Sequence, residues 1–151
     1  MDLEIASVVR LLAAVGAGVA LGYPREMVDK PIGMRTLALV SLGAAMVTVS
    51  AAAQFDSFKE PDAASRVLQG IVQGLMVGVG FIGAGVILRD TSTNRVHGLT
   101  TATTVWIAAA LGIACGLGAW VIALAGLLLA LIVLVVLKRL ERHVSPEMEK
   151  H

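Results

Sequence analysis

Five long apolar runs fill most of this 151-residue chain. Each run is close to the roughly 20 residues that a helix needs to cross a hydrocarbon core of about 30 Å. The hydrophobic share of the composition, 57%, agrees with this, since nearly all charged residues fall between the runs. The runs are Ile5–Tyr23, Thr36–Gln54, Val67–Leu88, Thr100–Leu117 and Ala119–Leu137. We therefore predict an all-α fold, a polytopic membrane helix bundle of about five transmembrane helices.

The chain is expected to form one membrane domain. We place this domain at residues 1–144 and a short cytoplasmic tail at residues 145–151, because only fourteen residues follow the last run. Asp2 and Glu4 precede the first run, whereas a cleaved secretory signal begins with cations. We therefore expect the first run to remain as a helix.

The cations between the runs predict an orientation. Five spans place the two termini on opposite sides, and loops rich in Lys and Arg face the cytoplasm. The other side keeps only Lys59 and Arg66, with Arg10 inside the first run. One side carries nine cations: Arg25, Lys30, Arg35, Arg89, Arg95, Lys138, Arg139, Arg142 and Lys150. We therefore predict a cytoplasmic C-terminus, with membrane lipid as a partner; no nucleic acid is expected, because no aromatic residues interleave with these cations.

The third run has a face of glycines when it is placed at about 100° per residue. Glycines let membrane helices approach closely, so we expect this helix at the centre of the bundle, with its bulky arc toward lipid. The residues of this arc are Leu68, Ile71, Val72, Leu75, Val79, Ile82 and Val86. Such a face also predicts a homo-oligomer or a complex with another membrane protein. The fifth run is nearly continuous Leu, Ile and Val, and we expect it at the periphery. The candidate packing or interface residues are Gly70, Gly74, Gly78, Gly80, Gly83 and Gly85.

Polar residues inside or beside the spans form a candidate polar site. The threonines of the fourth run either bond across to the third helix or bond their own backbone one turn earlier. Arg10 either points into the bundle, toward Asp56 or Asp62, or extends to the membrane surface. The candidate polar residues are Arg10, Arg66, Gln69, Gln73, Thr100, Thr101 and Thr104.

Charged residues between the runs form a second candidate set on the predicted cytoplasmic side. This cluster either docks a partner or anionic lipid, or only sets the topology. Its members are Arg25, Glu26, Lys30, Arg35, Arg89, Asp90 and Arg95.

The chemistry of an enzyme is missing from the sequence. The glycines of Gly80–Gly85 lie inside a span and lack the preceding strand of a nucleotide-binding fingerprint. His97 lies in a predicted loop, while His143 and His151 lie in the tail, so they form no ligand set. We predict no catalytic residue, no metal site, no cofactor and no enzymatic activity. No Asp or Glu lies well within a span, which disfavours a monomeric carrier of Mg²⁺.

Several short motifs stand in order along the chain. They are GYPRE at Gly22–Glu26, KPIGMRT at Lys30–Thr36, RVLQGIV at Arg66–Val72, GFIGAGVIL at Gly80–Leu88 and GLTTATTVW at Gly98–Trp106. Together they resemble the MgtC/SapB family of bacterial inner-membrane proteins, with the first two similar to one family signature, so the resemblance covers almost the whole chain. The chain departs from the pattern at Pro24, Leu37 and His97, and it carries about four additional residues between Val72 and Gly80. These would lengthen the third helix by a turn or form a bulge.

The resemblance implies a multipass inner-membrane protein linked to magnesium limitation and to survival in acid or within host cells. Some members carry an ACT-like domain after the last span, and we expect none here. Together with the glycine face, this predicts a non-enzymatic protein that acts through helix association, with itself or with a membrane partner. The alternative is a transporter or channel for a small solute or ion, with a path along Arg66, Gln69, Gln73 and the threonines of the fourth run.

Overall fold

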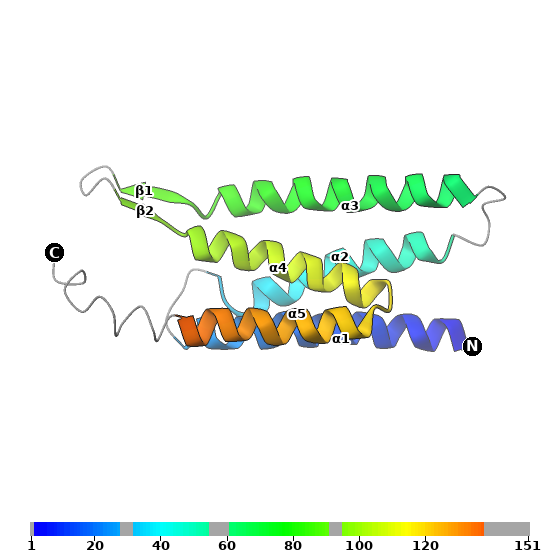
Figure 1. The fold of residues 1–151 in the computed structure, drawn as a ribbon, viewed down its shortest axis with the longest axis horizontal. Helices are drawn as coiled ribbons and strands as arrows, with labels where there is room; N and C mark the ends of the chain where they lie inside the picture. Colours follow the sequence, from blue (N-terminus) through cyan, green and yellow to red (C-terminus); the bar gives the residue numbers. More distant parts are fainter. Residues whose placement is uncertain (1, 28–31, 55–60, 91–94, 138–151) are drawn as a thin grey trace.

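The computed structural model describes residues 2–27, 32–54, 61–90 and 95–137. In these ranges the chain forms five helices that run alternately up and down (Figure 1). They are α1 (Asp2–Glu26), α2 (Met34–Ala52), α3 (Pro61–Ala84), α4 (Leu99–Gly116) and α5 (Trp120–Ile132), and α5 continues into the π-helical turn η2 (Val133–Leu137). All five are long and apolar enough to cross a membrane. The predicted all-α membrane bundle is confirmed, while the proposed domain boundary at residue 144 lies outside the described residues.

A small β-hairpin joins α3 to α4, where the sequence analysis expected a loop. Strand β1 (Leu88–Asp90) pairs antiparallel with β2 (Arg95–His97), so that Leu88 lies opposite His97. Gly98 follows with a φ of 90°, a left-handed conformation that favours glycine. A side chain at Gly98 would also meet the carbonyl oxygen of Val86. The end of the bundle that carries this hairpin is called the hairpin end below, and the other is called the opposite end.

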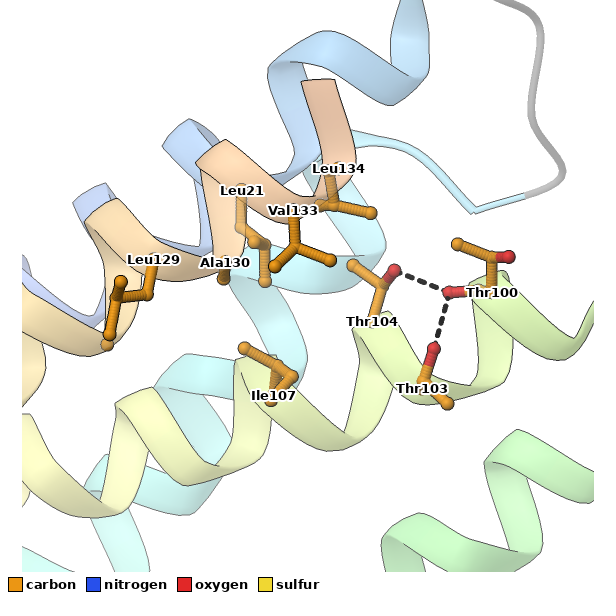
Figure 2. A pocket seen from close by; sticks show the side chains of 10 residues that line it. Leu21, Thr100, Thr103, Thr104, Ile107, Leu129, Ala130, Val133 and Leu134 are labelled. Carbon is orange, nitrogen blue, oxygen red and sulfur yellow. Dashed lines mark hydrogen bonds between the residues drawn. The ribbon is translucent and has the colours of Figure 1, made fainter. Parts of the chain in front are cut away.

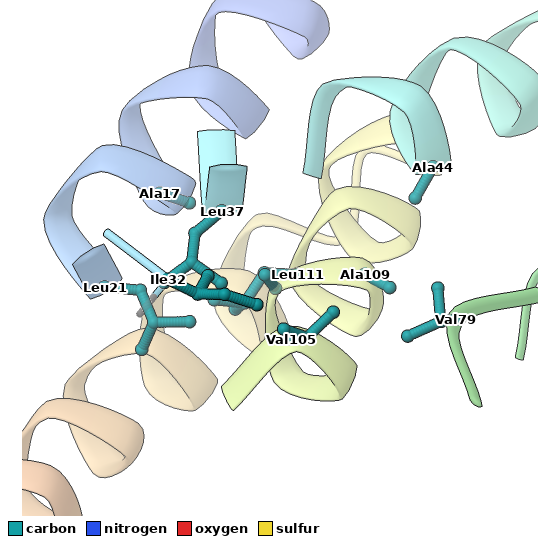
Figure 3. Packing of buried hydrophobic residues seen from close by; sticks show 10 residues of the cluster. Ala17, Leu21, Ile32, Leu37, Ala44, Val79, Val105, Ala109 and Leu111 are labelled. Atoms are coloured by element: carbon teal, nitrogen blue, oxygen red, sulfur yellow. The ribbon is translucent and has the colours of Figure 1, made fainter. Parts of the chain in front are cut away.

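Helix α4 lies at the centre of the bundle. In its span 56% of the residues are buried, against 6% in the spans of α3 and α5. The core brings Leu21 of α1 and Leu37 of α2 together with Val105 and Leu111 of α4 (Figure 3). The prediction that the third helix forms the centre is therefore wrong.

Close backbone contacts explain why α1, α2 and α4 form the core. A Cβ atom built on Gly18 of α1 would lie 2.6 Å from the Cα atom of Ala38 in α2. A Cβ atom on Gly112 of α4 would meet the carbonyl oxygen of Ser41, on another part of α2. Glycines at these positions let α1 and α4 both pack directly against the backbone of α2.

Helix α3 packs with the face that was predicted to meet lipid. Val79 is buried, and Leu75 and Val86 pack against the same core. In contrast, Cβ atoms built on Gly70 and Gly74 would meet no atom within 4 Å. The predicted arrangement of this helix is thus largely reversed: its arc with Leu75, Val79 and Val86 fills space against the core, and Gly70, Gly74 and Gly78 face outward. Gly83 is the exception, because it is buried and a Cβ there would lie 3.5 Å from the Cβ of Ala102 in α4.

Helix α5 is peripheral, as predicted. It packs along α1 and α4 (Figure 1), and Ala123 is its one buried residue. Most of its large apolar side chains are exposed, as expected for a helix that faces lipid.

Candidate functional site

Arg25 forms the centre of a polar cluster at the hairpin end. It lies in the last turn of α1, and its side chain is 4% exposed. The guanidinium donates from Nε to the carbonyl oxygen of Ile32 at 3.1 Å. It also donates to the hydroxyl oxygens of Thr104 at 3.2 Å and Thr101 at 2.6 Å. One planar group therefore ties the end of α1 to the segment before α2 and to the first turns of α4.

The charge of Arg25 is held by neutral oxygens. Its three acceptors are a backbone carbonyl and two hydroxyls, and no ion pair joins it to a carboxylate among the described residues. A guanidinium is suited to such a site because its five donors lie in a fixed plane and its charge is delocalised. The hairpin end consequently keeps a buried positive charge.

The threonines of α4 bond along their own helix. The Thr104 hydroxyl donates to the carbonyl oxygen of Thr100 at 2.6 Å, and the Thr103 hydroxyl donates to the same oxygen at 3.0 Å. No hydrogen bond joins these threonines to α3 in the part of the chain that the structure describes. Of the two alternatives from the sequence, the backbone bond is therefore present. With its proton engaged in this way, the Thr104 oxygen remains an acceptor for Arg25.

Glu26 holds the start of α2. Its Oε2 accepts a hydrogen bond from the backbone N–H of Met34 at 3.0 Å, which satisfies one of the free donors of the first turn of that helix. A negative charge at a helix N-terminus is favourable as well. A side chain at Gly33 would collide with the same carboxylate, so the Glu26 side chain would have to move away from the Met34 N–H.

Replacing Glu26 is expected to weaken the connection between α1 and α2. Glu26→Ala should lower the free energy of unfolding by about 1 kcal/mol, since the Met34 N–H loses its side-chain acceptor. Glu26→Gln keeps an acceptor and should retain most of that stability. Thermal unfolding in detergent compares the three proteins, and equal midpoints for the parent and Glu26→Ala would contradict this role.

Arg10 acts at the opposite end. Its Nη1 donates to the carbonyl oxygen of Gly116 at 3.1 Å, at the C-terminus of α4, where the unpaired carbonyls carry partial negative charge. Gly118 follows with a φ of 73°, and a Cβ there would lie 3.1 Å from Nη2 of Arg10. Of its predicted carboxylate partners, Asp62 is exposed and Asp56 lies outside the described residues. Arg10 is half-buried and directed into the bundle.

The structure does not bring the candidate polar residues together. Arg66, Gln69 and Gln73 are exposed on α3, the first two in its first half and Gln73 at its middle, whereas Thr101 and Thr104 are buried near the start of α4. The charge cluster is described only in part. Arg35 is exposed; Lys30 and the side chains of Arg89, Asp90 and Arg95 lie outside the described residues.

A partly open cleft of about 450 Å³ lies between α4 and α5, at the hairpin half of the bundle. Figure 2 shows Leu129, Val133 and Leu134 of α5 and η2 lining one wall, while Ile107 and the threonines of α4 line the other. The lining also includes Leu21, Gly126 and Ala130. No group of three or more His, Cys, Asp or Glu side chains suited to a metal lies among the described residues.

The comparison with known proteins decides the family. The model of the MgtC family matches residues 11–143, which is most of the chain. The chain belongs to the MgtC family. It is similar to the protein SrpB of Synechococcus elongatus, with 44% identity over 140 residues that cover 88% of this chain and 75% of SrpB. No solved structure matches it.

Two further relatives are longer than this chain. The protein MgtC of Salmonella typhimurium is 36% identical over 138 residues, which cover 91% of this chain and 55% of MgtC. The protein SapB of Bacillus subtilis is 35% identical over 136 residues, covering 86% of this chain and 56% of SapB. The aligned region thus spans a little over half the length of these two relatives.

In this MgtC-family protein, segments that resemble family signatures meet around Arg25. Arg25 comes from GYPRE, Ile32 from KPIGMRT, and Thr101 and Thr104 from GLTTATTVW, although the threonines lie 76 and 79 residues further along the chain. The sequence analysis assigned Arg25 and these threonines to two separate sets. The alternating direction of the spans could have predicted that these sets meet. It places the end of the first helix and the start of the fourth on the same side of the membrane.

The segment of the third run that the sequence analysis interpreted as carrying additional residues is helical. α3 continues without interruption from Pro61 to Ala84, and the segment Val72–Gly80 is helical throughout. Of the two alternatives from the sequence, the extra helical turn is therefore present rather than a bulge. Pro24, another departure from the family pattern, is accommodated in the last turns of α1, which still reaches Arg25 and Glu26.

Proposed function

We propose that this MgtC-family protein is a non-enzymatic bacterial inner-membrane protein that acts through association of α3 with a second copy of the chain. One observation carries the proposal, which is that a mixed stripe of glycines and polar side chains faces outward from a membrane span. This α3 outer stripe consists of Arg66, Gln69, Gly70, Gln73, Gly74, Val77, Gly78 and Phe81, all of them exposed.

The outer stripe is poorly suited to lipid. Gln69 and Gln73 carry amide groups that find no partner in hydrocarbon, and burying such a group without a hydrogen bond costs about 1–3 kcal/mol by protein mutational data. Gly70, Gly74 and Gly78 leave an open track along the same helix, since a Cβ atom at each would meet nothing within 4 Å. A protein surface supplies both hydrogen bonds and close packing here, whereas lipid tails supply neither.

A second copy suits this stripe because the stripe is self-complementary. An amide donates and accepts, so Gln69 or Gln73 can pair with its counterpart across a two-fold axis. Glycine tracks at four-residue spacing also pack against each other at short helix separation. Phe81 is 84% exposed near the other end of the stripe and would be covered in the same interface.

Gly74→Leu is expected to weaken self-association by tenfold or more, corresponding to about 1.4 kcal/mol, because the new side chain fills the open track. Gly43→Leu is the matched control, since Gly43 is also exposed and open but lies on α2. The measurement is the mass of each protein in lipid nanodiscs over a dilution series. Equal association of the Gly74 and Gly43 variants would exclude the outer stripe as the interface.

Other results would point to other functions. If the parent chain is monomeric and captures a different membrane protein through Gly74, that protein is the partner in place of a second copy. Solute flux in liposomes that is abolished by Gln73→Leu would support the alternative transporter or channel. Within one protomer that path has no support, because Gln73 is exposed on the outer stripe of α3, whereas Thr101 and Thr104 are buried in α4.

The same proposal includes an orientation and a cellular role. Nine cations on one side of the predicted topology support a cytoplasmic hairpin end and C-terminus. The family resemblance supports a role in adaptation to magnesium limitation, to acid or to growth within host cells. Labelling of single cysteines introduced at Ser57 and Ser92, in a background that lacks Cys115, tests the orientation from the two sides of the membrane.

A further inference from the structure

The cleft between α4 and α5 has an apolar part and a polar end. Ile107, Leu129 and Val133 line the apolar part, while Thr100, Thr103 and Thr104 line the end nearest the hairpin (Figure 2). Leu129 and Val133 are 62% and 54% exposed, so the cleft opens outward from the bundle. Both helices are membrane spans, and hydrocarbon chains therefore surround the opening.

One hydroxyl at the polar end is free to donate. The protons of Thr103 and Thr104 are engaged by the carbonyl oxygen of Thr100. The hydroxyl of Thr100 itself forms no hydrogen bond with any described residue, and its side chain is exposed. A ligand at this end can therefore accept a hydrogen bond from Thr100.

The electrostatics at this end favour an anion. Arg25 lies directly behind Thr104, donating to its oxygen, and its charge meets only neutral acceptors among the described residues. The neighbouring carboxylate of Glu26 accepts the backbone N–H of Met34 at the start of α2. Thr100 also lies in the first turn of α4, where the helix carries partial positive charge.

We propose that the α4–α5 cleft binds an acidic phospholipid, with an acyl chain in the apolar part and the anionic head group at the threonines. The volume of the cleft, about 450 Å³, falls within the range of small-molecule sites, roughly 300–1,000 Å³. A helix about 10 Å wide with a rise of 1.5 Å per residue would place only about four residues in that volume. A single flexible chain fits such a cleft, whereas a partner helix does not.

The test is native mass spectrometry of the purified full chain from micelles that contain equal amounts of phosphatidylglycerol and phosphatidylcholine. The parent should retain one phosphatidylglycerol per protomer, with a preference of about tenfold over phosphatidylcholine. Ala130→Phe fills the cleft and should reduce retention about tenfold. Val121→Phe, on the exposed face of the same helix, should retain lipid as the parent does.

Thr100→Val tests the polar end without filling the cleft. It should keep a bound lipid but reduce the preference for phosphatidylglycerol several-fold, because the free hydroxyl donor is lost while the exposed position tolerates valine. Thr103→Val, whose hydroxyl proton is already engaged, should change the preference less.

Three results would overturn the proposal. One is equal retention of the two lipids by the parent, which would show that the cleft does not select an anionic head group. Another is unchanged retention in Ala130→Phe together with an unchanged lipid preference in Thr100→Val, which would place the lipid elsewhere. The third is a co-purified peptide in place of lipid that Ala130→Phe expels, which would make a protein segment the occupant.

Discussion

Arg25→Met is expected to lower the free energy of unfolding by about 3 kcal/mol, equivalent to a fall of roughly 6–12 °C in the midpoint of thermal unfolding. Methionine preserves much of the volume but donates no hydrogen bond. The Ile32 carbonyl and the two threonine hydroxyls then lose a charged donor, and each such bond contributes about 1.5–3 kcal/mol, although the contributions are not additive. The same change separates the end of α1 from the start of α4.

Arg25→Lys separates geometry from charge. Lysine keeps the positive charge but replaces a planar fork with a compact ammonium, which cannot span three acceptors on two segments as the guanidinium does. We therefore expect Arg25→Lys to lose at least one of the bonds and about 1.5–3 kcal/mol. Arg35→Lys is the control because Arg35 is exposed, and its midpoint should match that of the parent.

The Arg25 variants also measure the cost of burying the charge itself. Removing a buried charge relieves its desolvation, and in some proteins apolar replacements are neutral or stabilising. An unchanged or raised midpoint for Arg25→Met, measured with circular dichroism in detergent, would show that the hydrogen bonds only compensate for burial. Arg25 would then have no net stabilising role.

The sequence predicted the spans because the information for a span is local. A run such as Ala119–Leu137 must be helical in a membrane whatever its neighbours are, since its backbone groups have no water to bond. The arrangement of the helices depends on pairs of surfaces instead. Gly74 and Gly112 look alike in the sequence, but the first faces outward and the second contacts the backbone of Ser41. Only the position of the partner helix distinguishes them.

The candidate site was predictable in its parts but not in its assembly. Arg25, Thr101 and Thr104 were all named from the sequence as candidate residues. Their contact depends on the side chain of Arg25 turning inward rather than toward the membrane surface, which follows from the burial of Ile32 and the close packing of α1 on α2. The outward position of Gly70, Gly74 and Gly78 was missed for a related reason: α3 uses its bulky arc against α4, and these glycines lie on the opposite side of the helix.

Gly112→Ala is expected to destabilise the bundle by about 3 kcal/mol, near the upper end of what overpacking costs, and to lower the unfolding midpoint by roughly 6–12 °C. The added methyl group would meet the carbonyl oxygen of Ser41 and lie 2.9 Å from the Cβ of Ala44. An exposed side chain would turn aside, but a backbone carbonyl moves only with its helix. α2 and α4 must therefore separate, and this would loosen the core between them.

Gly43→Ala provides the comparison, because Gly43 lies on α2 and a Cβ atom there meets nothing within 4 Å. Alanine is favoured over glycine inside a helix by about 1 kcal/mol, so Gly43→Ala should be neutral or slightly stabilising. Size-exclusion chromatography after heating to a series of temperatures gives the unfolding midpoint of each variant and of the parent. Because both substitutions add the same methyl group, their difference isolates the contact with α2. Equal midpoints would mean that α2 and α4 lie further apart than the structure places them, and α4 would lose its position as the central helix.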